Sequence, residues 1–578
     1  MVDVRFLVRF SSLLCYLALS PLVTNRALHR RCETARHKAK QHRAAPVNPR
    51  DTITNWNAAA WAVRRAPGCS SLILSLSKHA HATLNTSSTC KMAANCAICA
   101  AATEFDATTT YDVCIVGAGP CGLALLSALH AQEGNLTDEQ QATMQARGRR
   151  GRIKKSEREA LRVCVVDPAG AFLHEWRGRF DALDIALLRS PAWAHPDFFS
   201  EAALQEYAWR RGREAEIHSI DDFTTTSLRR LTEVNAGLFR LPGAGLFSDF
   251  CCDLSKTLPH AMLRGEASAV EKRSEGGYAV AVGDASVRTR AVVFALGAAT
   301  TPCVPPQFAL APTIVHSNDW RALRDLDFGS KDTVLVVGGG LSAAQAALRA
   351  AKRGAGRVVL CSRRKLCTRT YDLELDWMNR RSTGKGSARR RLYEFKGAPL
   401  EERRAFVAKA RGGATVPQYY LDLLKTAEDR GAIAHFVDEV CDVQEVDGAH
   451  RVAFNKSEPL VATKIILATG SQLDCGTIPL LRDTAKRLAL PVVSCLPAVD
   501  DSLRWGDEDL FVVGALAQLQ VGPDAGNLTG ARRAAEICAA NLGSHDDLVE
   551  DYNVLANTYD VFGDSSDTES ETESSSTD

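Results

Sequence analysis

The sequence predicts an α/β fold with two Rossmann-like dinucleotide-binding domains, the second inserted into the first. Two glycine-rich turns carry this prediction. The first, GAGPCG, follows the apolar run Val113–Val116, and the second, GGGLSA, follows the apolar run Val334–Val337. An apolar segment of helical length comes after each turn, so each unit is read as strand, tight turn and helix. Several later apolar runs that end in glycine supply further strands.

Small residues stand at the three positions where each turn must come close to a bound pyrophosphate. The first glycine permits the tight turn, the second lets the backbone approach the phosphates, and the third small residue packs the helix onto the sheet. The helix N-terminus then presents free N–H groups to the phosphates. The candidate cofactor-binding residues are Gly117, Gly119, Pro120 and Gly122 in the first turn and Gly338, Gly340 and Ala343 in the second. Two such turns predict two dinucleotides and electron transfer between them.

The strand after the first turn ends in an acidic residue. This strand, Val163–Val166, is followed by Asp167, and a carboxylate there accepts hydrogen bonds from the ribose of an adenosine cofactor. A polar insertion, residues 133–159, lengthens the interval before it and contains the sequence RGRRGRIKK. We interpret the insertion as a surface loop, and with a net charge of only +2 we expect no nucleic-acid partner.

The strand after the second turn ends without a carboxylate. The run Arg357–Cys361 is followed by Ser362, Arg363 and Arg364. A hydroxyl and two guanidinium groups suit a ribose 2′-phosphate, which an arginine binds through a bidentate fork. This pattern predicts NADPH at the second turn, and a solvated strand end is the alternative interpretation.

The later apolar runs are read as strands that return to a cofactor. They are Ala291–Gly297, Lys464–Gly470 and Asp509–Gly514, and the last is followed by a loop and an amphipathic helix. The loop ends at Asn527. The N-terminus of that helix carries partial positive charge, which favours an anionic ligand there.

The two ends of the chain differ in composition from the middle. Residues 1–105 are expected to be a disordered or targeting leader, because the first 103 positions hold fourteen Lys or Arg and three acids. A translation start at Met92 is the alternative, and it would make the protein cytoplasmic rather than organelle-targeted. An arginine and a proline interrupt the apolar run Phe6–Val23, so we expect no stable membrane span. Residues 546–578 are acidic and rich in serine, which predicts a disordered tail.

The eighteen cysteines follow no regular spacing. Cys96 and Cys99 form an isolated CxxC without a second pair, so no metal site is predicted. Cysteines inside apolar runs, such as Cys114 and Cys164, are read as buried thiols of a reducing compartment.

From about Tyr111 to Leu542 the chain resembles the two-dinucleotide-binding flavoproteins. Within them it resembles the class B flavin monooxygenases, which include the ornithine and lysine N-hydroxylases. The tryptophan that this family places after the ribose acid corresponds to Trp176, and its HxxxW motif corresponds to His316 and Trp320. The ATG of the N-hydroxylases corresponds to Ala468, Thr469 and Gly470, with Ser471 in place of the following tyrosine. The late Gly-Asp of the family is Gly514 and Ala515 here, so its carboxylate is missing.

The resemblance implies FAD at the first turn and NADPH at the second. It implies an FAD-binding domain in two parts, residues 110–325 and 469–545. The NADPH-binding domain, residues 330–468, would be inserted between them and would carry a helical insertion, residues 376–432.

The resemblance also implies roles for single residues. Gly514 and Asn527 are expected to contact the flavin, and Trp176 is expected to flank it. His316 and Asn318 are the candidate catalytic residues. A structural histidine, a turn asparagine and a core tryptophan are the alternative interpretations, and all three stay open.

The function implied by the resemblance is that of an FAD- and NADPH-dependent monooxygenase. It would use oxygen and a flavin hydroperoxide to hydroxylate a small amine- or sulfur-containing metabolite. One alternative is another flavin oxidoreductase, such as an oxidase or a disulfide reductase. A disulfide reductase needs a closely spaced redox dithiol, and Cys361 and Cys367 do not have this spacing. The other alternative is a flavin-binding regulatory protein without turnover.

Overall fold

The computed structural model describes residues 102–132, 161–219, 239–297, 300–374, 377 and 388–542. Residues Met1–Asn95 and Cys96–Asp578 form two separate units, and every described residue belongs to the second. The polar insertion, the acidic tail, Met92 and the Cys96/Cys99 pair therefore lie outside the described residues. The last residues of the expected leader are described, and they form strand β1 (Ala102–Glu104).

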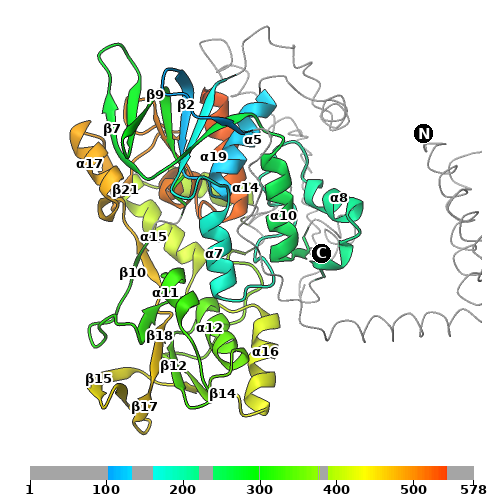
Figure 1. The fold of residues 1–578 in the computed structure, drawn as a ribbon, viewed down its shortest axis with the longest axis vertical. Helices are drawn as coiled ribbons and strands as arrows, with labels where there is room; N and C mark the ends of the chain where they lie inside the picture. Colours follow the sequence, from blue (N-terminus) through cyan, green and yellow to red (C-terminus); the bar gives the residue numbers. More distant parts are fainter. Residues whose placement is uncertain are drawn as a thin grey trace, which may run out of the picture. The chain divides into compact units, whose positions relative to one another are not determined.

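A mixed sheet carries the first glycine-rich turn and occupies the upper part of Figure 1. Its central strand β2 (Thr110–Val116) is almost fully buried, as expected for a continuous apolar run covered on both faces. The strand order is β1, β6 (His260–Arg264), β3 (Val163–Asp167), β2, β9 (Ala285–Phe294), β8 (Tyr278–Val282) and β7 (Ala267–Lys272), with β22 (Leu510–Val512) paired to β9. The strands from β1 to β9 in this order, and β22, pair in parallel, whereas β9, β8 and β7 pair antiparallel.

Two helices from opposite ends of the described chain pack together on this sheet. They are α5 (Pro120–Gln132), which follows the first turn, and α19 (Leu528–Leu542). Both contribute buried residues to the same apolar core as β2 and β9. Because the parallel strands end at one edge, the loops after β2, β3, β9 and β22 converge there.

A second sheet, parallel throughout, carries the second glycine-rich turn and lies in the lower part of Figure 1. Its order is β11 (Ile314–His316), β18 (Lys464–Leu467), β12 (Thr333–Val337), β13 (Arg357–Ser362) and β14 (Ile433–Val437). Helices α11 (Trp320–Asp325), α12 (Leu341–Lys352) and α16 (Gln418–Asp429) share a core with it. An antiparallel sheet of β15 (Val440–Val446), β16 (Ala449–Phe454) and β17 (Leu460–Ala462) adjoins it.

The chain passes between the two large sheets through a pair of short antiparallel strands. These are β10 (Thr300–Pro302) and β19 (Ser471–Leu473). Two helices of the expected helical insertion, α14 (Ala388–Gly397) and α15 (Leu400–Arg411), follow the second sheet's strand β13 in the sequence. Helix α15 nevertheless lies between the two sheets and packs on α18 (Gln518–Val521) of the first (Figure 1).

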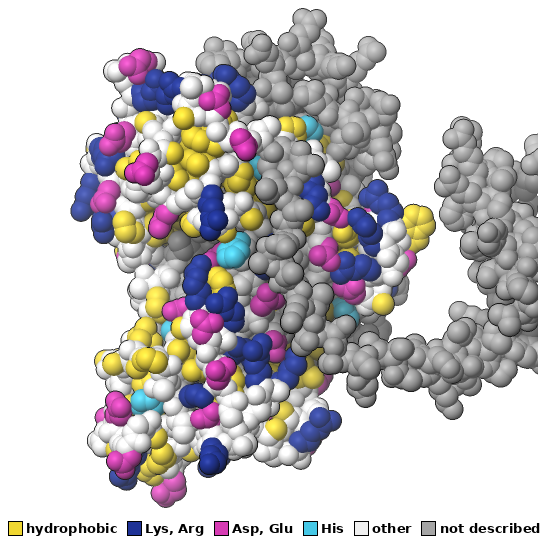
Figure 2. All heavy atoms as spheres, in the orientation of Figure 1, with side chains coloured by type: hydrophobic (Ala, Val, Ile, Leu, Met, Phe, Trp, Pro, Cys, Tyr) yellow, Lys and Arg dark blue, Asp and Glu magenta, His cyan; other side chains and the backbone are white. Residues whose placement is uncertain are grey.

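Four further helices complete the described fold around the first sheet. They are α7 (His174–Ala182), α8 (Ala203–Arg210), α10 (Ala244–Ser255) and α17 (Pro479–Arg487). Two short antiparallel strand pairs lie near these helices in the sequence, β4 (Ile217–His218) with β5 (Leu241–Pro242) and β20 (Val492–Val493) with β21 (Leu496–Pro497). No helix in the described part of the chain is long and apolar enough to span a membrane. Figure 2 shows side chains of both charges interspersed over one face.

Candidate active site

The first glycine-rich turn leaves open space only where a cofactor would need it. A Cβ on Gly117, whose φ is +112°, would lie 2.6 Å from the carbonyl oxygen of Ala295 at the end of β9. A Cβ on Gly122 would overlap the carbonyl oxygen of Gly117. In contrast, a Cβ on Gly119 would meet no atom within 4 Å. The outer glycines therefore close the turn, and Gly119 faces free space at the start of α5.

Asp167 lies beside this turn, as the sequence predicts, and it also holds the turn in shape. One carboxylate oxygen accepts a hydrogen bond from the backbone N–H of Ala118 at 3.0 Å, and the other accepts from Ala169 at 2.9 Å. The carboxylate thus connects the end of β3 to the glycine turn. Binding of a ribose hydroxyl by Asp167 remains a prediction.

The late strand β22 ends against the same turn. Gly514 has a φ of +77°, and a Cβ there would lie 3.1 Å from Sγ of Cys121. Burial raises the pKa of the Cys121 thiol to about 11, so the thiol is protonated at neutral pH. Ala515 follows and is buried. The only cysteine described at this turn is therefore not a reactive thiolate, which weighs against disulfide reduction.

Asn527 caps the helix that begins beside the first turn. Its side-chain oxygen accepts a hydrogen bond from the backbone N–H of Gly530 at 3.1 Å, and α19 starts at Leu528. Its side-chain nitrogen donates to Asp372 at 3.2 Å. Both ends of the Asn527 amide thus have protein partners, so a direct contact of this side chain with the flavin remains a prediction.

The second glycine-rich turn is built like the first. A Cβ on Gly338, with φ +152°, would overlap the carbonyl oxygen of Ala468 at the end of β18. The buried methyl group of Ala343 lies 3.2 Å from the same position and packs α12 onto the sheet. A Cβ on Gly340 would lie 3.2 Å from Cβ of Ala414. A segment from between α15 and α16 therefore covers this turn, and no sequence motif indicated that contact.

The three residues expected to bind a 2′-phosphate lie in different environments. Ser362 is buried, and its hydroxyl donates to the carbonyl oxygen of Arg364 and contacts Nε2 of His435 at 2.9 Å. Arg363 keeps 77% of its side chain exposed, with Glu439 at 4.0 Å. Arg364 is exposed and points its guanidinium toward Gly413. The two arginines can reach a ligand, whereas Ser362 shapes the loop that presents them.

His316 is held in one neutral form by its neighbours. Nδ1 accepts a hydrogen bond from the backbone N–H of Asn318 at 3.1 Å, and Nε2 contacts the hydroxyl of Thr469 at 3.4 Å. That hydroxyl donates to Cys303, so it accepts from His316 Nε2–H. Burial lowers the pKa of His316, opposed by its contact with the Gly470 backbone. This geometry agrees with a structural histidine, and proton transfer by His316 remains a prediction.

Asn318 lies at the connection between the two sheets. Its side-chain nitrogen donates to the hydroxyl of Thr300 on β10 at 2.8 Å. The contact joins the loop after β11 to the connecting strands. A hydrogen bond from Asn318 to the flavin remains a prediction.

The two tryptophans of the family pattern both anchor α7. Trp176 stacks on Phe180 with ring centroids 3.7 Å apart and contacts Phe247 of α10 at 5.2 Å. Trp320 is buried against Gly178, and its indole N–H donates to Glu175 at 2.6 Å. Trp176 therefore belongs to an aromatic cluster, and Trp320 fixes α11 of the second sheet to α7 of the first.

No sequence motif marks three residues, Arg189, Asp372 and Arg411, that connect the part of the chain around the first sheet with the part around the second. Arg189 of the first half donates to the carbonyl oxygens of Thr370 at 3.1 Å and Arg369 at 2.8 Å. Arg411, the last residue of α15, donates to the carbonyl oxygen of Pro523 at 2.8 Å and pairs with Asp372 at 3.0 Å. Partners so distant in the sequence become visible only in the folded chain.

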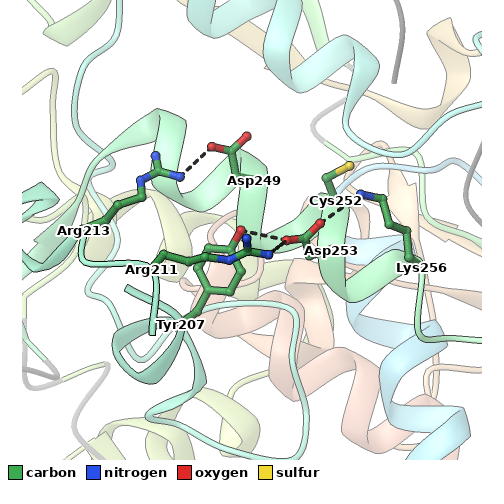
Figure 3. Close-up of a pocket in the computed structure, with 7 residues that line it drawn as sticks. All are labelled: Tyr207, Arg211, Arg213, Asp249, Cys252, Asp253 and Lys256. Carbon is green, nitrogen blue, oxygen red and sulfur yellow. Dashed lines mark hydrogen bonds and ion pairs between the residues drawn. The ribbon is translucent and has the colours of Figure 1, made fainter. Parts of the chain in front are cut away.

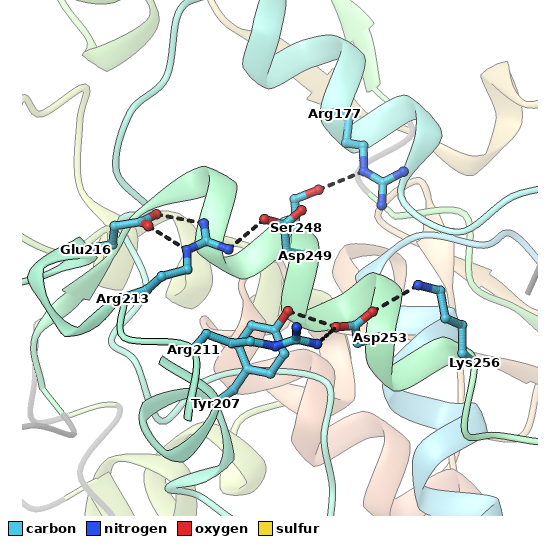
Figure 4. A network of polar contacts seen from close by, with 9 residues as sticks. All are labelled: Arg177, Tyr207, Arg211, Arg213, Glu216, Ser248, Asp249, Asp253 and Lys256. Carbon is cyan, nitrogen blue, oxygen red and sulfur yellow. Dashed lines mark hydrogen bonds and ion pairs between the residues drawn. The ribbon is translucent and has the colours of Figure 1, made fainter. Parts of the chain in front are cut away.

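A charged hollow of about 430 Å³ lies elsewhere, between α8, α10 and the turn after α8 (Figure 3). Its charges pair with one another. Asp253 binds Tyr207 at 2.9 Å, Arg211 at 2.8 Å and Lys256 at 2.9 Å. Arg213 bridges Asp249 and a glutamate beside the hollow, and Arg177 donates to a serine of α10 (Figure 4). We interpret this network as a structural brace between α8 and α10.

In the described residues no cluster of His, Cys, Asp and Glu could hold a metal ion. The polar groups near the two turns are instead backbone N–H groups, guanidinium groups and carboxylates. Such groups bind phosphates and ribose hydroxyls.

Comparison with known proteins agrees with this architecture. Residues 246–375 match the family model of L-lysine 6-monooxygenase/L-ornithine 5-monooxygenase. No curated protein matches the sequence. The structure is similar to ornithine N-hydroxylase from Kutzneria sp. 744, with 17% identity, a TM-score of 0.55, and 75% of this chain and 99% of that chain covered.

Two further structures have the same fold. The cadaverine monooxygenase of Erwinia amylovora is 15% identical with a TM-score of 0.54, over 76% of this chain and 95% of that one. The ornithine hydroxylase of Pseudomonas aeruginosa is 17% identical with a TM-score of 0.53, over 75% and 99%. The chain is therefore similar in fold to the N-hydroxylating flavin monooxygenases, and one segment of it matches their family model. The predicted fold class and the resemblance seen in the sequence are both confirmed.

Proposed function

We propose that the protein is an FAD- and NADPH-dependent monooxygenase that hydroxylates the nitrogen of a small amine. The observation that carries the proposal is that one segment, residues 411–416, contacts both the second glycine-rich turn and the loop that precedes α19. Ala414 of this segment lies against Gly340 of the second turn. Arg411 binds the carbonyl oxygen of Pro523 in the loop before α19. Gly526 of that loop lies beside Ala515, and the preceding Gly514 lies beside Cys121 of the first turn. A nicotinamide and a flavin must meet for hydride transfer, and this segment connects the second turn to the loop that lies beside the end of β22.

The first turn fits FAD. The open space over Gly119 admits a pyrophosphate, and the N-terminus of α5 offers N–H groups to it. Asp167 lies at the end of β3, within reach of a ribose that follows the turn. The N-terminus of α19 supplies a second set of N–H groups next to β22. The structures of the Kutzneria and Erwinia relatives contain FAD, which supports the same assignment here.

The second turn fits NADPH rather than NADH. The strand after it ends in two exposed arginines and no carboxylate, which favours a 2′-phosphate over a free 2′-hydroxyl. The Kutzneria structure contains NADP⁺, in agreement with this choice. Arg363 is the preferred candidate, because 77% of its side chain is exposed and its ion pair with Glu439 is long.

The proposed reaction consumes one amine, one O₂, one NADPH and one proton, and it yields a hydroxylamine, water and NADP⁺. Bound FAD supplies the redox chemistry that divides the two oxygen atoms between product and water. The chain's own residues position the groups and limit access of water. His316 keeps its proton on Nε2, facing Thr469, and Trp320 closes the junction between α7 and α11.

A coupled assay tests the proposal. Purified protein would be supplied with NADPH and oxygen and offered ornithine, lysine, cadaverine and a thioether. NADPH oxidation, oxygen uptake and hydroxylamine formation would be measured together. We expect hydroxylamine in amounts close to the NADPH consumed with at least one amine, because the described relatives act on such amines.

Two outcomes would contradict the proposal. NADPH oxidation that yields only hydrogen peroxide with every amine would indicate an oxidase. Bound FAD without NADPH-dependent reduction would indicate a flavin-binding regulatory protein, and the missing carboxylate at Ala515 makes that the relevant alternative.

A further inference from the structure

A carboxylate from the segment between β13 and β14 of the second sheet faces the loop that precedes α19. Asp372 lies after β13, and its side chain is 19% exposed. It accepts hydrogen bonds from Arg411 at 3.0 Å and from the side chain of Asn527 at 3.2 Å. Asn527 in turn caps α19. Asp372 therefore connects the NADPH side of the molecule to the first turn of the helix expected to face the flavin.

Arg411 holds the same loop at a second point. It ends α15 and donates to the carbonyl oxygen of Pro523 at 2.8 Å. A Cβ on Gly526 would lie 3.7 Å from Nη1 of Arg411 and 3.6 Å from Cβ of Ala515. The guanidinium group and Ala515, the position at which the late strand has no carboxylate, thus both lie beside Gly526.

The inner side of this loop is fixed independently. Arg533 of α19 forms a buried ion pair with Asp524 and donates to the carbonyl oxygen of Val521 at 2.7 Å. The loop from 521 to 527 is therefore held by α19 from inside and by Asp372 and Arg411 from outside. Only the outer pair, Asp372 and Arg411, comes from the segment between β13 and β14 of the second sheet.

The segment that carries Asp372 is itself immobilised. The hydroxyl of Tyr371 donates to the carbonyl oxygen of Phe239 at 2.5 Å, and Arg189 binds the carbonyl oxygens of the two preceding residues. Asp372 is thus presented at a fixed place, so ordering its side chain costs little entropy when a ligand binds.

We propose that Asp372, acting through Arg411 and Asn527, is a positioning residue for the flavin. It holds the loop before α19 and balances the guanidinium charge there, in the absence of a carboxylate at Ala515. This inference rests on the proposed binding of FAD. It gives the NADPH half of the chain a direct influence on the flavin half.

The variants Asp372→Asn and Arg411→Gln test the proposal by flavin affinity and midpoint potential. Both should raise the dissociation constant of FAD about tenfold, the effect of losing one charge-assisted hydrogen bond. The potentials should move in opposite directions. Asp372→Asn leaves a positive charge unbalanced, which stabilises the anionic reduced flavin and raises the potential, whereas Arg411→Gln lowers it. A purely structural role would not give shifts of opposite sign.

Asp332→Asn is the matched control. Asp332 has a side-chain exposure of 20% and an ion pair with Lys464 at 2.7 Å, but it lies just before β12, at the opposite end of that strand from the second turn. The Asp332→Asn substitution should leave the FAD dissociation constant and the midpoint potential of the flavin unchanged. If one of the two test variants fails to fold, the other still interrupts the same contact.

The outcomes separate this inference from the proposed function. A wild-type protein that binds no FAD would overturn both. Wild-type protein that binds FAD without hydroxylating amines would overturn the reaction class only. Unchanged affinity and potential in Asp372→Asn, with FAD bound to the wild type, would overturn the role of Asp372.

Discussion

The substitution Gly119→Asp separates the stability of the fold from the binding of FAD. Gly119 directly precedes α5, and its carbonyl oxygen accepts the hydrogen bond from Leu123 at 3.0 Å, so it occupies the N-cap position. A Cβ there meets no atom within 4 Å. Aspartate is a favourable N-cap residue, better than glycine by a few tenths of a kcal/mol. We therefore expect the free energy of unfolding of the apoprotein to change by less than about 0.5 kcal/mol.

The effect on FAD should be much larger. The open space over Gly119 is where the pyrophosphate would lie, so the new carboxylate would face a like charge at roughly 4 Å. At an effective dielectric constant near 20 this repulsion costs about 4 kcal/mol. The dissociation constant should rise by about three powers of ten. The protein should therefore be purified without its yellow colour.

The assay compares the wild type with Gly119→Asp and the control Gly397→Asp. Gly397 ends α14, and a Cβ there also meets no atom within 4 Å. Urea unfolding would measure stability, and fluorescence titration with FAD would measure affinity. A folded Gly119→Asp protein that retains one FAD per chain would refute the assignment of the first turn. Loss of FAD in Gly397→Asp as well would show that the effect is not specific to the turn.

Three further predictions follow from the same structure. Arg363→Ala and Arg364→Ala should weaken the binding of NADPH about ten- to hundredfold without weakening the binding of NADH, since each removes a charge-assisted contact of about 1.5–3 kcal/mol. Equal rates of flavin reduction by NADPH and NADH in the wild type would contradict this prediction. Burial lowers the pKa of His316 below its ordinary value of 6.5, so the unfolded chain binds more protons and stability falls as the pH drops below 6.5. His316→Gln should therefore lose less stability than the wild type between pH 7.5 and pH 5, and an unchanged difference in urea unfolding would exclude this contribution. Arg349 is buried, and no described residue accepts a hydrogen bond from its Nε or Nη1, while Nη2 donates to the carbonyl oxygen of Arg324 at 3.3 Å. Arg349→Met should therefore be neutral or stabilising by about 1 kcal/mol, and a loss of more than about 2 kcal/mol in urea unfolding would contradict this.

Much of the fold could be read from local patterns in the sequence. The apolar runs before each glycine-rich turn became β2 and β12, and the three later runs ending in glycine became the ends of β9, β18 and β22. These elements are visible because strand period, turn chemistry and helix length are short-range properties. The glycine positions follow for the same reason, since a Cβ at Gly117 or Gly338 collides with backbone.

The surroundings of individual side chains could not be read in the same way. The sequence marked Asn527 and Ser362 as cofactor residues, yet both side chains have protein partners. It left open whether His316 is structural, and the folded chain provides partners for both ring nitrogens. Hydrogen-bond partners come from segments far away in the sequence, so a local pattern carries no information about them.

The sequence by itself determined that two strand–turn–helix units of the dinucleotide-binding type lie on one chain, and it predicts which nucleotide suits each. Tertiary structure alone decided how the two units meet. Arg411, Asp372 and Arg189 show no motif, but they join residues more than a hundred positions apart. The physical reason is that turn geometry depends on neighbouring residues, whereas the placement of charges at a seam depends on how whole sheets and helices pack.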